Sequence, residues 1–374
     1  MDVPRDDPRK DREVQSRGYL VWLRETQNGE MEEVAARNGV SAARIFRSGR
    51  KGFTIRGRMP ETALRRLRDD EEVEEIEADI KVQASAQTVP WSVKRLGVPN
   101  VGGGSIVSGV DIFVLDTGVQ VGHPDINLVE SLSFVLTETE VDDLNGHGTL
   151  VAGCAAAKDN DTHVVGVAPG ARVHSYKVLD HEGSGYLSDI IAAIQQVIQW
   201  RQNNTQTPAV INLSLGGYSG TTTYNSLDLS VLSAVRDHNL PCVVAAGNDA
   251  YNAWYFTPSH VREALTVGAY NVNNQFSSFS NYGSVVDLLA PGENVLTTAL
   301  GSGTTTASGT SFSCPYTAGA LARYLQRNPT VTAITAMANL KTISKQTYNG
   351  GNPDITGVPT TTTPSYSLYV SSLA

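Results

Sequence analysis

The feature that most limits the fold of this chain is a series of apolar runs that alternate with helix-like stretches from residue 110 onward. The apolar runs are "VDIFVLD" at 110–116, "ARVHSYKVLD" at 171–180, "PAVINLSLGG" at 208–217 and "LPCVVAAGN" at 240–248. Between them lie patterns typical of helices, at 147–157, 187–203 and 224–239. Strands that are apolar on both faces need cover on both faces, so the pattern predicts an α/β fold, a parallel β-sheet with helices on both sides.

Polar or small residues stand where three of these strands end. Asp116 closes the first run, Gly216 lies at the end of the third, and Asn248 follows the fourth. Ligands of open parallel sheets bind at the carboxyl ends of the strands. We therefore expect the functional site at that edge.

Charge divides the chain at about residue 84. Of the first 84 residues 35 are charged, against 32 of the remaining 290. Residues 18–84 alternate strand and helix patterns, which predicts a small α+β module with an antiparallel sheet. The charged residues 1–17 are expected to be disordered. The predicted organisation is a disordered segment 1–17, a module 18–84 and a main domain 85–374.

Composition also excludes several partners. An acidic main domain with few basic residues is unsuited to nucleic acid, and no apolar run approaches the ~18 residues of a membrane helix. The charged start lacks the apolar stretch of a secretory signal, which fits either an intracellular location or a leader absent from this sequence. Cys154, Cys242 and Cys314 lie among small or apolar residues and are predicted to be buried free thiols.

Asp116 begins an Asp-Thr-Gly tripeptide, which raises two interpretations. An aspartic protease needs a second such aspartate to share a proton, but the chain has no second Asp-Thr-Gly or Asp-Ser-Gly, and its α/β pattern is wrong for that class. The other interpretation is a buried aspartate that orients a histidine. It requires a suitable histidine and a nucleophile elsewhere in the chain.

Of the seven histidines, only His147 lies between glycines, in "NGHGTLVAGC", where a loop enters a helix of small residues. The other six are predicted to be surface or satisfied core residues. Ser311, in "GTSFSCP", is the candidate nucleophile. We expect Pro315 in the first turn of the following helix, which would put Ser311 at the helix N-terminus, where its amide N–H is unpaired. Asn248 offers a second donor for an oxyanion.

"DTG", "HGT" and "GTSFSCP" occur in the order Asp, His, Ser, with Asn248 between the last two. This order resembles the subtilisin-like serine proteases (subtilases), specifically their proteinase K-like branch, over residues 85–374. The resemblance implies that Ser311 attacks a peptide carbonyl, that His147 takes its proton and that Asp116 orients His147. It implies that Asn248 and the Ser311 amide hold the oxyanion, with no cofactor for catalysis.

The resemblance also implies how substrate binds. An extended polypeptide would pair with two edge segments of the enzyme. Uncharged walls predict a broad preference for apolar or aromatic P1 residues, those just before the scissile bond, and Leu179 and Leu187 could form an apolar S4 site. The implied substrate-binding residues are Gly183, Ser184, Gly185, Ser214, Leu215, Gly216, Ala245, Ala246 and Gly247.

A structural calcium ion is implied at Asp287, completed by carbonyls of residues 262–264. Residues 18–84 resemble a propeptide that assists folding and then inhibits the enzyme, with autocatalytic cleavage near residues 83–85. The expected molecule is a secreted, monomeric zymogen whose partners are polypeptides and its own propeptide. Two alternatives stay open: a non-catalytic relative that acts as a binding module, and a peptide ligase or esterase that uses the same cleft.

Overall fold

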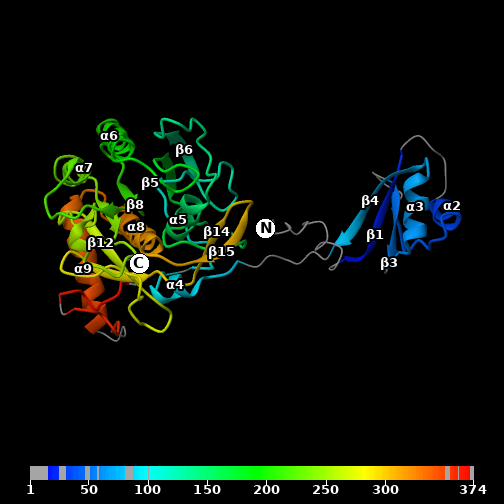
Figure 1. The fold of residues 1–374 in the computed structure, drawn as a ribbon. Coiled ribbons are helices and arrows are strands. Elements are labelled where there is room, and N and C mark those ends of the chain that lie inside the picture. The colour runs from blue at the N-terminus through cyan, green and yellow to red at the C-terminus, as the bar shows by residue number, and fades with distance from the viewer. Residues whose placement is uncertain are drawn as a thin grey trace, which may run out of the picture. The chain divides into compact units, whose positions relative to one another are not determined.

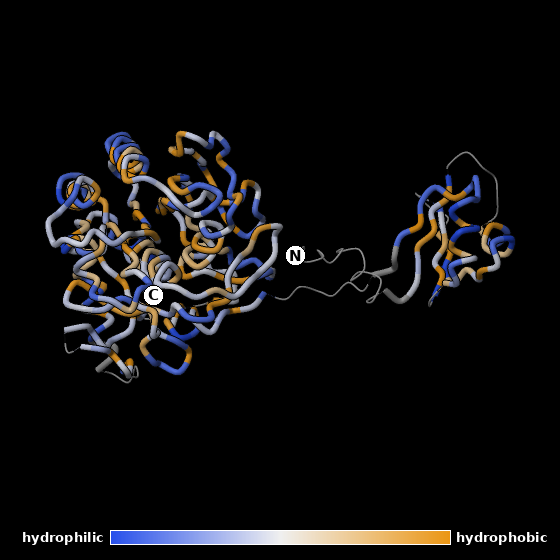
Figure 2. The backbone as a smooth tube through the Cα atoms, viewed as in Figure 1, coloured by the Kyte–Doolittle hydropathy of each residue, from blue (hydrophilic) through white to orange (hydrophobic). Residues whose placement is uncertain are grey.

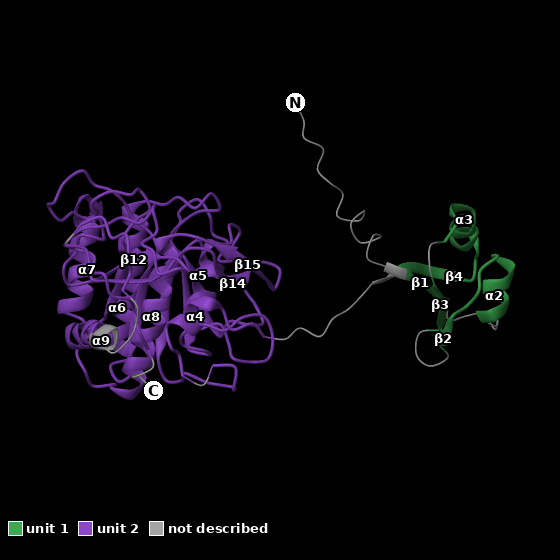
Figure 3. Cartoon of the chain, turned by 90° about the horizontal axis from the view of Figure 1, so that it is seen from below, with its two compact units in different colours: residues 1–84 green, residues 85–374 purple. Residues whose placement is uncertain are grey.

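The computed structural model describes residues 16–24, 31–46, 51–56, 59–80, 87–99, 101–349, 354–360 and 362–370. The chain divides into two compact units, residues 1–84 and 85–374 (Figure 3). The segment that we expected to be disordered, 1–17, lies outside the described residues except for Ser16 and Arg17, which begin the first strand. The expected cleavage region at 83–85 also lies outside them.

In its described residues, the first unit has a four-stranded antiparallel sheet and two helices, which confirms the small α+β module. Its strand order is β2-β3-β1-β4. It has a core of its own, in which Val21, Phe53 and Leu67 are completely buried. Its elements are β1 (Ser16–Leu23), α2 (Met31–Arg37), β2 (Arg44–Phe46), β3 (Gly52–Arg56), α3 (Glu61–Asp69) and β4 (Val73–Ile80).

The second unit is built on a seven-stranded parallel sheet, which confirms the predicted fold class. The strand order is β13-β12-β10-β8-β5-β7-β6. Apolar residues occupy the strands and the inner parts of the helices, while the connecting loops are more hydrophilic (Figure 2). Its strands are β5 (Asp111–Asp116), β6 (Leu128–Ser133), β7 (Arg172–Lys177), β8 (Ala209–Leu213), β10 (Cys242–Ala245), β12 (Leu265–Tyr270) and β13 (Leu288–Pro291).

Helices flank both faces of this sheet (Figure 1). Helix α5 packs on α8, and α6 packs on α7. The helices are α4 (Trp91–Arg95), α5 (His147–Ala156), α6 (Leu187–Asn203), α7 (Ser226–Arg236), α8 (Thr310–Arg327) and α9 (Ala333–Asn349), with a 3₁₀ turn η1 (Ala253–Tyr255). Two short antiparallel pairs are also present: β9 (Gly217–Tyr218) with β11 (Phe256–Thr257), and the hairpin of β14 (Val295–Ala299) and β15 (Gly303–Ala307). Within the described part of the chain, no helix is long and apolar enough to cross a membrane.

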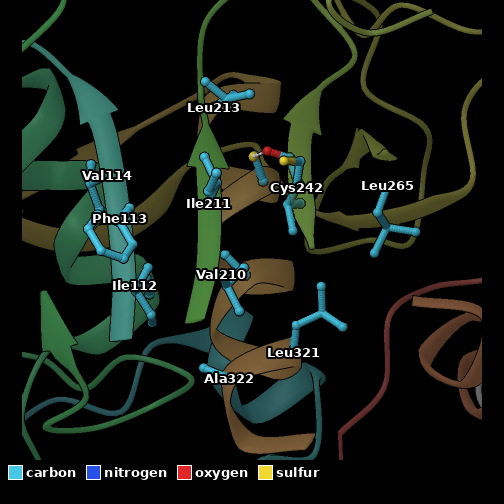
Figure 4. Close-up of a cluster of buried hydrophobic side chains, with 14 of the residues drawn as sticks. Ile112, Phe113, Val114, Val210, Ile211, Leu213, Cys242, Leu265, Leu321 and Ala322 are labelled. Atoms are coloured by element: carbon cyan, nitrogen blue, oxygen red, sulfur yellow. Dashed lines mark hydrogen bonds between the residues drawn. The ribbon is translucent and has the colours of Figure 1, made fainter. Parts of the chain in front are cut away.

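The sheet core is made by the apolar runs that the sequence showed. Figure 4 shows Ile112 and Val114 of β5 beside Val210 and Ile211 of β8, with Leu321 of α8 below them. All five side chains are completely buried. Burial of such residues is worth roughly 1.5–3 kcal/mol per side chain, so these strands are the most strongly fixed part of the fold.

A glycine stands at the contact between helices α5 and α8. A Cβ atom on Gly319 of α8 would lie 2.7 Å from the carbonyl oxygen of Ala155 in α5. A side chain at Gly319 would therefore force the helices apart. His147 begins α5 and Ser311 is the second residue of α8, so this contact links the two helices that carry the candidate base and nucleophile.

Candidate active site

Asp116 and His147 are joined as the sequence analysis expected. The Nδ1 atom of His147 lies 2.7 Å from Oδ1 of Asp116. Asp116 ends β5 and is completely buried, while the His147 side chain is 29% exposed. The Thr117 amide donates to the same Oδ1 at 2.7 Å, which fixes the carboxylate further. The buried carboxylate can therefore orient the ring while the rest of the ring stays accessible.

A second buried carboxylate, Asp143, positions the loop that carries His147. It accepts hydrogen bonds from the Thr117 hydroxyl (2.9 Å), the Gly146 amide (2.8 Å) and the Thr149 amide (2.9 Å). These bonds tie the start of α5 to the turn after β5. Sequence analysis missed Asp143, although an aspartate just before a helix start is a common capping signal.

Gly148 allows this close contact between α5 and the Asp-Thr-Gly turn. A Cβ atom at Gly148 would lie 2.0 Å from the carbonyl oxygen of Gly118. No side chain fits in that space, so a larger residue would displace the helix or the turn. The glycine after His147 is therefore required by packing at the site itself.

The pKa of His147 is shifted upward. Burial alone would lower it, but the charge of Asp116, the hydrogen bond to Asp116 and the charge of Asp143 together raise it above its ordinary value. An imidazole with a raised pKa is a stronger base, and it binds a proton more readily once one is offered.

Ser311 lies near His147 at the start of α8. The ring of the next residue, Phe312, is 5.8 Å from the imidazole of His147, centroid to centroid. In the structure the Ser311 hydroxyl donates to the carbonyl of Ser214 at 3.1 Å, and no hydrogen bond joins it to His147 among the described residues. Catalytic hydrogen bonds often form fully only when substrate is bound.

The position of Pro315 differs from the expectation. We predicted it in the first turn of the helix, but α8 begins at Thr310 and Pro315 lies inside it. A proline inside a helix removes one amide donor, here the one that would bond to the Ser311 carbonyl. That carbonyl accepts from the Ser214 hydroxyl instead, at 2.8 Å, which satisfies it.

Asn248 presents its amide nitrogen to the same region. Its Oδ1 accepts from the Thr310 amide (2.8 Å) and from the Thr310 hydroxyl (3.0 Å). Since the oxygen is engaged in this way, Nδ2 is the end of the side chain left for a ligand. The Ser311 amide lies in the first turn of α8, where helical carbonyl partners are lacking.

One cleft of about 760 Å³ collects these residues. Its lining includes His147, Ser311 and Asn248, together with Leu179 and Leu187. It also contains two carboxylates that the sequence analysis did not consider, Glu182 and Asp249. Every predicted substrate-binding residue lines it: Gly183, Ser184, Gly185, Ser214, Leu215, Gly216, Ala245, Ala246 and Gly247.

The structure does not fit calcium at Asp287. Its Oδ1 accepts from the Lys341 ammonium at 2.9 Å, and its Oδ2 accepts from the Thr266 amide at 2.9 Å. Both oxygens are thus engaged by donors, and one donor is itself a cation. These contacts disfavour calcium at Asp287.

A different group of oxygens lacks donors. Both carboxylate oxygens of Asp125 and the Oε1 atom of Gln87 are buried without a hydrogen-bond partner among the described residues. The Gln87 amide nitrogen donates to the carbonyls of Lys158 (2.7 Å) and Val164 (3.2 Å), and the Val164 backbone and the Asn160 side chain also lie near Asp125, where they lower its pKa. Burial raises the pKa of Asp125 to about 6. No cluster of three or more His, Cys, Asp or Glu side chains that could hold a metal occurs in the described ranges.

The three cysteines are free and buried, as predicted.

Comparison with known proteins decides the family. The sequence model of the Subtilase family matches residues 107–358. This chain belongs to the subtilase family. The chain is 40% identical over 273 residues to an alkaline protease of Alkalihalobacillus alcalophilus, covering 73% of this chain and 69% of that protein. It is also 40% identical over 257 residues to Subtilisin Savinase of Lederbergia lenta, covering 68% of this chain and 91% of that one.

Two further relatives extend the comparison. An extracellular serine proteinase of Thermus sp. (strain Rt41A) is 36% identical over 306 residues, covering 79% of this chain and 71% of that protein. The crystal structure of a cold adapted subtilisin-like serine proteinase superposes with a TM-score of 0.62 at 29% identity, covering 77% of this chain and 99% of that one. The protein is accordingly a subtilisin-like serine endopeptidase. Assignment to the proteinase K-like branch stays a prediction.

Proposed function

We propose that this subtilase cleaves internal peptide bonds with Asp116, His147 and Ser311 as its triad. The observation that carries the proposal is the 2.7 Å contact between His147 Nδ1 and Asp116 in the cleft that also holds Ser311. Because Asp116 engages Nδ1, the Nε2 atom is the nitrogen left to accept a proton. The Ser311 hydroxyl turns from the Ser214 carbonyl toward Nε2 when it attacks.

The tetrahedral oxyanion would be held by two donors. These are Nδ2 of Asn248, whose oxygen is fixed by Thr310, and the amide of Ser311. Donors held in place before the reaction stabilise developing charge without reorganisation. Removal of one such donor in subtilisin costs about 2.7–4 kcal/mol, and we expect a similar loss here for Asn248→Leu.

The cleft walls support a preference for apolar or aromatic P1 residues. Leu215, Gly216, Ala245 and Ala246 carry no charge, and an extended substrate would pair with the segments at 183–185 and 214–216. No catalytic cofactor enters the reaction. The substrates are polypeptides.

We infer that residues 18–84 form an inhibitory propeptide and that the enzyme is a monomeric zymogen. Support comes from the compact first unit with a core of its own. One relative is named an extracellular serine proteinase, which favours secretion of this chain as well.

We propose structural calcium at Asp125 and Gln87 rather than at Asp287. Carboxylate and carbonyl oxygens are the ligands that Ca²⁺ prefers. The Gln87 side chain lies against the carbonyls of Lys158 and Val164, and Val164 also lies beside Asp125. The ion would neutralise the buried carboxylate and so stabilise the fold. A chelator should lower the Tm of the wild type, whereas Asp125→Ala should have a low Tm that calcium does not raise.

A fluorophosphonate probe and N-terminal sequencing test the proposal. Ser311 should react with the probe in the processed enzyme, and the wild type should cut itself near Ala84, whereas Ser311→Ala should stay uncut. If Ser311 is not labelled and the alanine variant is still found cleaved near Ala84, the chain is a binding module that another protease cuts. If the labelled enzyme cleaves small esters or joins peptides but does not hydrolyse polypeptides, the esterase or ligase alternative holds.

A further inference from the structure

Three buried polar residues, Cys314, Asn212 and Ser214, form a continuous series of hydrogen bonds that ends at the main-chain carbonyl of Ser311. Cys314 Sγ lies 3.2 Å from Asn212 Oδ1, and Asn212 Nδ2 lies 3.0 Å from Ser214 Oγ. Ser214 Oγ then reaches the carbonyl of Ser311 at 2.8 Å. Asn212 and Cys314 are completely buried, and Ser214 is 3% exposed. These hydrogen bonds therefore connect two residues of α8, Cys314 and Ser311, by way of Asn212 in β8.

The direction of each bond follows from the number of protons available. Ser214 has one hydroxyl proton, and the Ser311 carbonyl can only accept it, so Ser214 Oγ must accept from Asn212. Nδ2 of Asn212 consequently faces Ser214, and Oδ1 faces Cys314. The Cys314 thiol lies 3.2 Å from that oxygen and 3.3 Å from the Val243 carbonyl, so its single proton is shared between these two acceptors. Burial raises the pKa of the thiol, so it keeps that proton.

Ser214 holds the nucleophile at two points. Its hydroxyl donates to the main-chain carbonyl of Ser311. That carbonyl has no donor from the helix itself, because Pro315 lacks an amide N–H. Its own carbonyl accepts from the Ser311 hydroxyl at 3.1 Å. If Ser214 shifts, both the backbone and the reacting oxygen of Ser311 shift with it.

We propose that Asn212 and Cys314 are positioning residues for the Ser311 nucleophile, acting through Ser214. The proposal rests on the proposed function, since it takes Ser311 as the attacking group. Asn212 fixes where Ser214 Oγ points, and the Cys314 thiol fixes which way the Asn212 amide is turned. A buried cysteine that only filled space would have no such dependence on its proton.

Cys242 is a matched control for the loss of a buried thiol. It lies in β10, in the same apolar cluster (Figure 4), and its Sγ donates to the Leu240 carbonyl at 3.6 Å. The Cys314 thiol lies near enough to raise the pKa of Cys242, but no hydrogen bond joins Cys242 to Asn212 among the described residues. Cys242→Ala therefore removes a thiol of equal burial without touching Asn212. Cys314→Ser keeps a proton donor at the position in question, and Cys314→Ala removes it.

The experiment measures kcat, KM and the fluorophosphonate labelling rate of processed enzyme, normalised to active sites. Misplacement of reacting groups lowers kcat more than binding, so Asn212→Leu should lose about 30-fold and Cys314→Ala about fivefold in kcat, with KM within about twofold. Cys314→Ser and Cys242→Ala should stay within about twofold of wild type. The pH profile should keep its midpoint in every variant, because the contact between His147 and Asp116 is untouched.

Equal losses in Cys314→Ala and Cys242→Ala, or a failure of Cys314→Ser to restore kcat, would overturn the proposal. So would Asn212→Leu if it lowered the Tm alone and left kcat unchanged. Should Asn212→Leu not fold, the three cysteine variants decide the question by themselves. A wild type that is not labelled at Ser311 would instead refute the proposed function, so the two failures are distinguishable.

Discussion

Strand β5 has a buried aspartate at each end, and each aspartate is hydrogen-bonded to a histidine. At its end, Asp116 contacts His147 at 2.7 Å, and at its beginning, Asp111 contacts His174 at 2.8 Å. Both aspartates are at most 1% exposed. The two ends of β5 thus carry the same kind of pair, an aspartate and a histidine, at nearly the same distance.

The two histidines differ in what their second ring nitrogen does. The Nδ1 atom of His174 contacts Glu130 at 2.8 Å while its Nε2 contacts Asp111, and the side chain is 7% exposed. In His147 only Nδ1 contacts an aspartate, and the rest of the ring faces the cleft. An imidazole becomes a base only if one nitrogen is left for substrate chemistry. We therefore expect the Asp111–His174 pair to be structural and the Asp116–His147 pair to be catalytic.

The largest expected difference concerns the histidines themselves. His147→Ala should lower kcat by about 10⁶, the size of loss that removal of the equivalent group causes in subtilisin, while the Tm changes little. The variant cannot process itself, so its propeptide is removed with a trace of active enzyme before assay. A loss below about 100-fold would show that His147 is not the base.

The aspartates give the next comparison. Asp116→Asn should lower kcat by about 10⁴, because the amide stabilises the wrong imidazole tautomer. Asp111→Asn should leave kcat unchanged and lower the Tm. Steady-state kinetics and thermal unfolding of both variants check this, and equal kinetic losses at the two ends would contradict the distinction.

Removal of His174 should act on stability alone. His174→Ala leaves the buried carboxylate of Asp111 with Arg172 as its remaining partner, so the free energy of unfolding should fall by about 3 kcal/mol. Urea unfolding measures this loss, with Ser311→Ala as the background in all samples to prevent self-digestion. An unchanged urea midpoint would show that the Asp111–His174 pair contributes nothing to the stability of the fold.

The smallest effect is a shift in pH dependence. Because the pKa of His147 is raised, kcat/KM should fall tenfold per pH unit below a midpoint that lies above 6.5. The raised pKa of His147 has the opposite effect on stability, which it increases at low pH. The protonated pair stabilises the fold below pH 6.5, and this contribution is lost as pH rises through the raised pKa. A midpoint at or below 6.5 in the labelling rate of Ser311 would contradict the shift, and His174→Ala should not move it.

Sequence patterns predicted the elements whose signal is local. The apolar runs that became β5, β8 and β10 are long enough to identify strands, and the position of polar residues at their ends located the site. The Thr-rich hairpin β14–β15 was missed because β15 is mostly exposed and has no apolar alternation.

The errors arose where a partner lies far away in the chain. Asp287 was taken for a calcium ligand because nothing near it reveals Lys341, 54 residues later. Asp125 was overlooked because Val164, which lies near it, and Gln87, which binds the Val164 carbonyl, come from separate segments. Pro315 was placed by a rule for helix starts, whereas the Ser214 hydroxyl compensates for it inside the helix.

The glycine contact between α5 and α8 has a consequence for how this enzyme could be adapted. Gly319 lies eight residues from Ser311, about 12 Å along the helix. It is buried, away from substrate and solvent. Even one added methyl group there would wedge the helices apart and change the spacing of base and nucleophile. Selection for faster or slower turnover can therefore tune the reaction from deep inside the protein, at a residue that no scan of the cleft would choose.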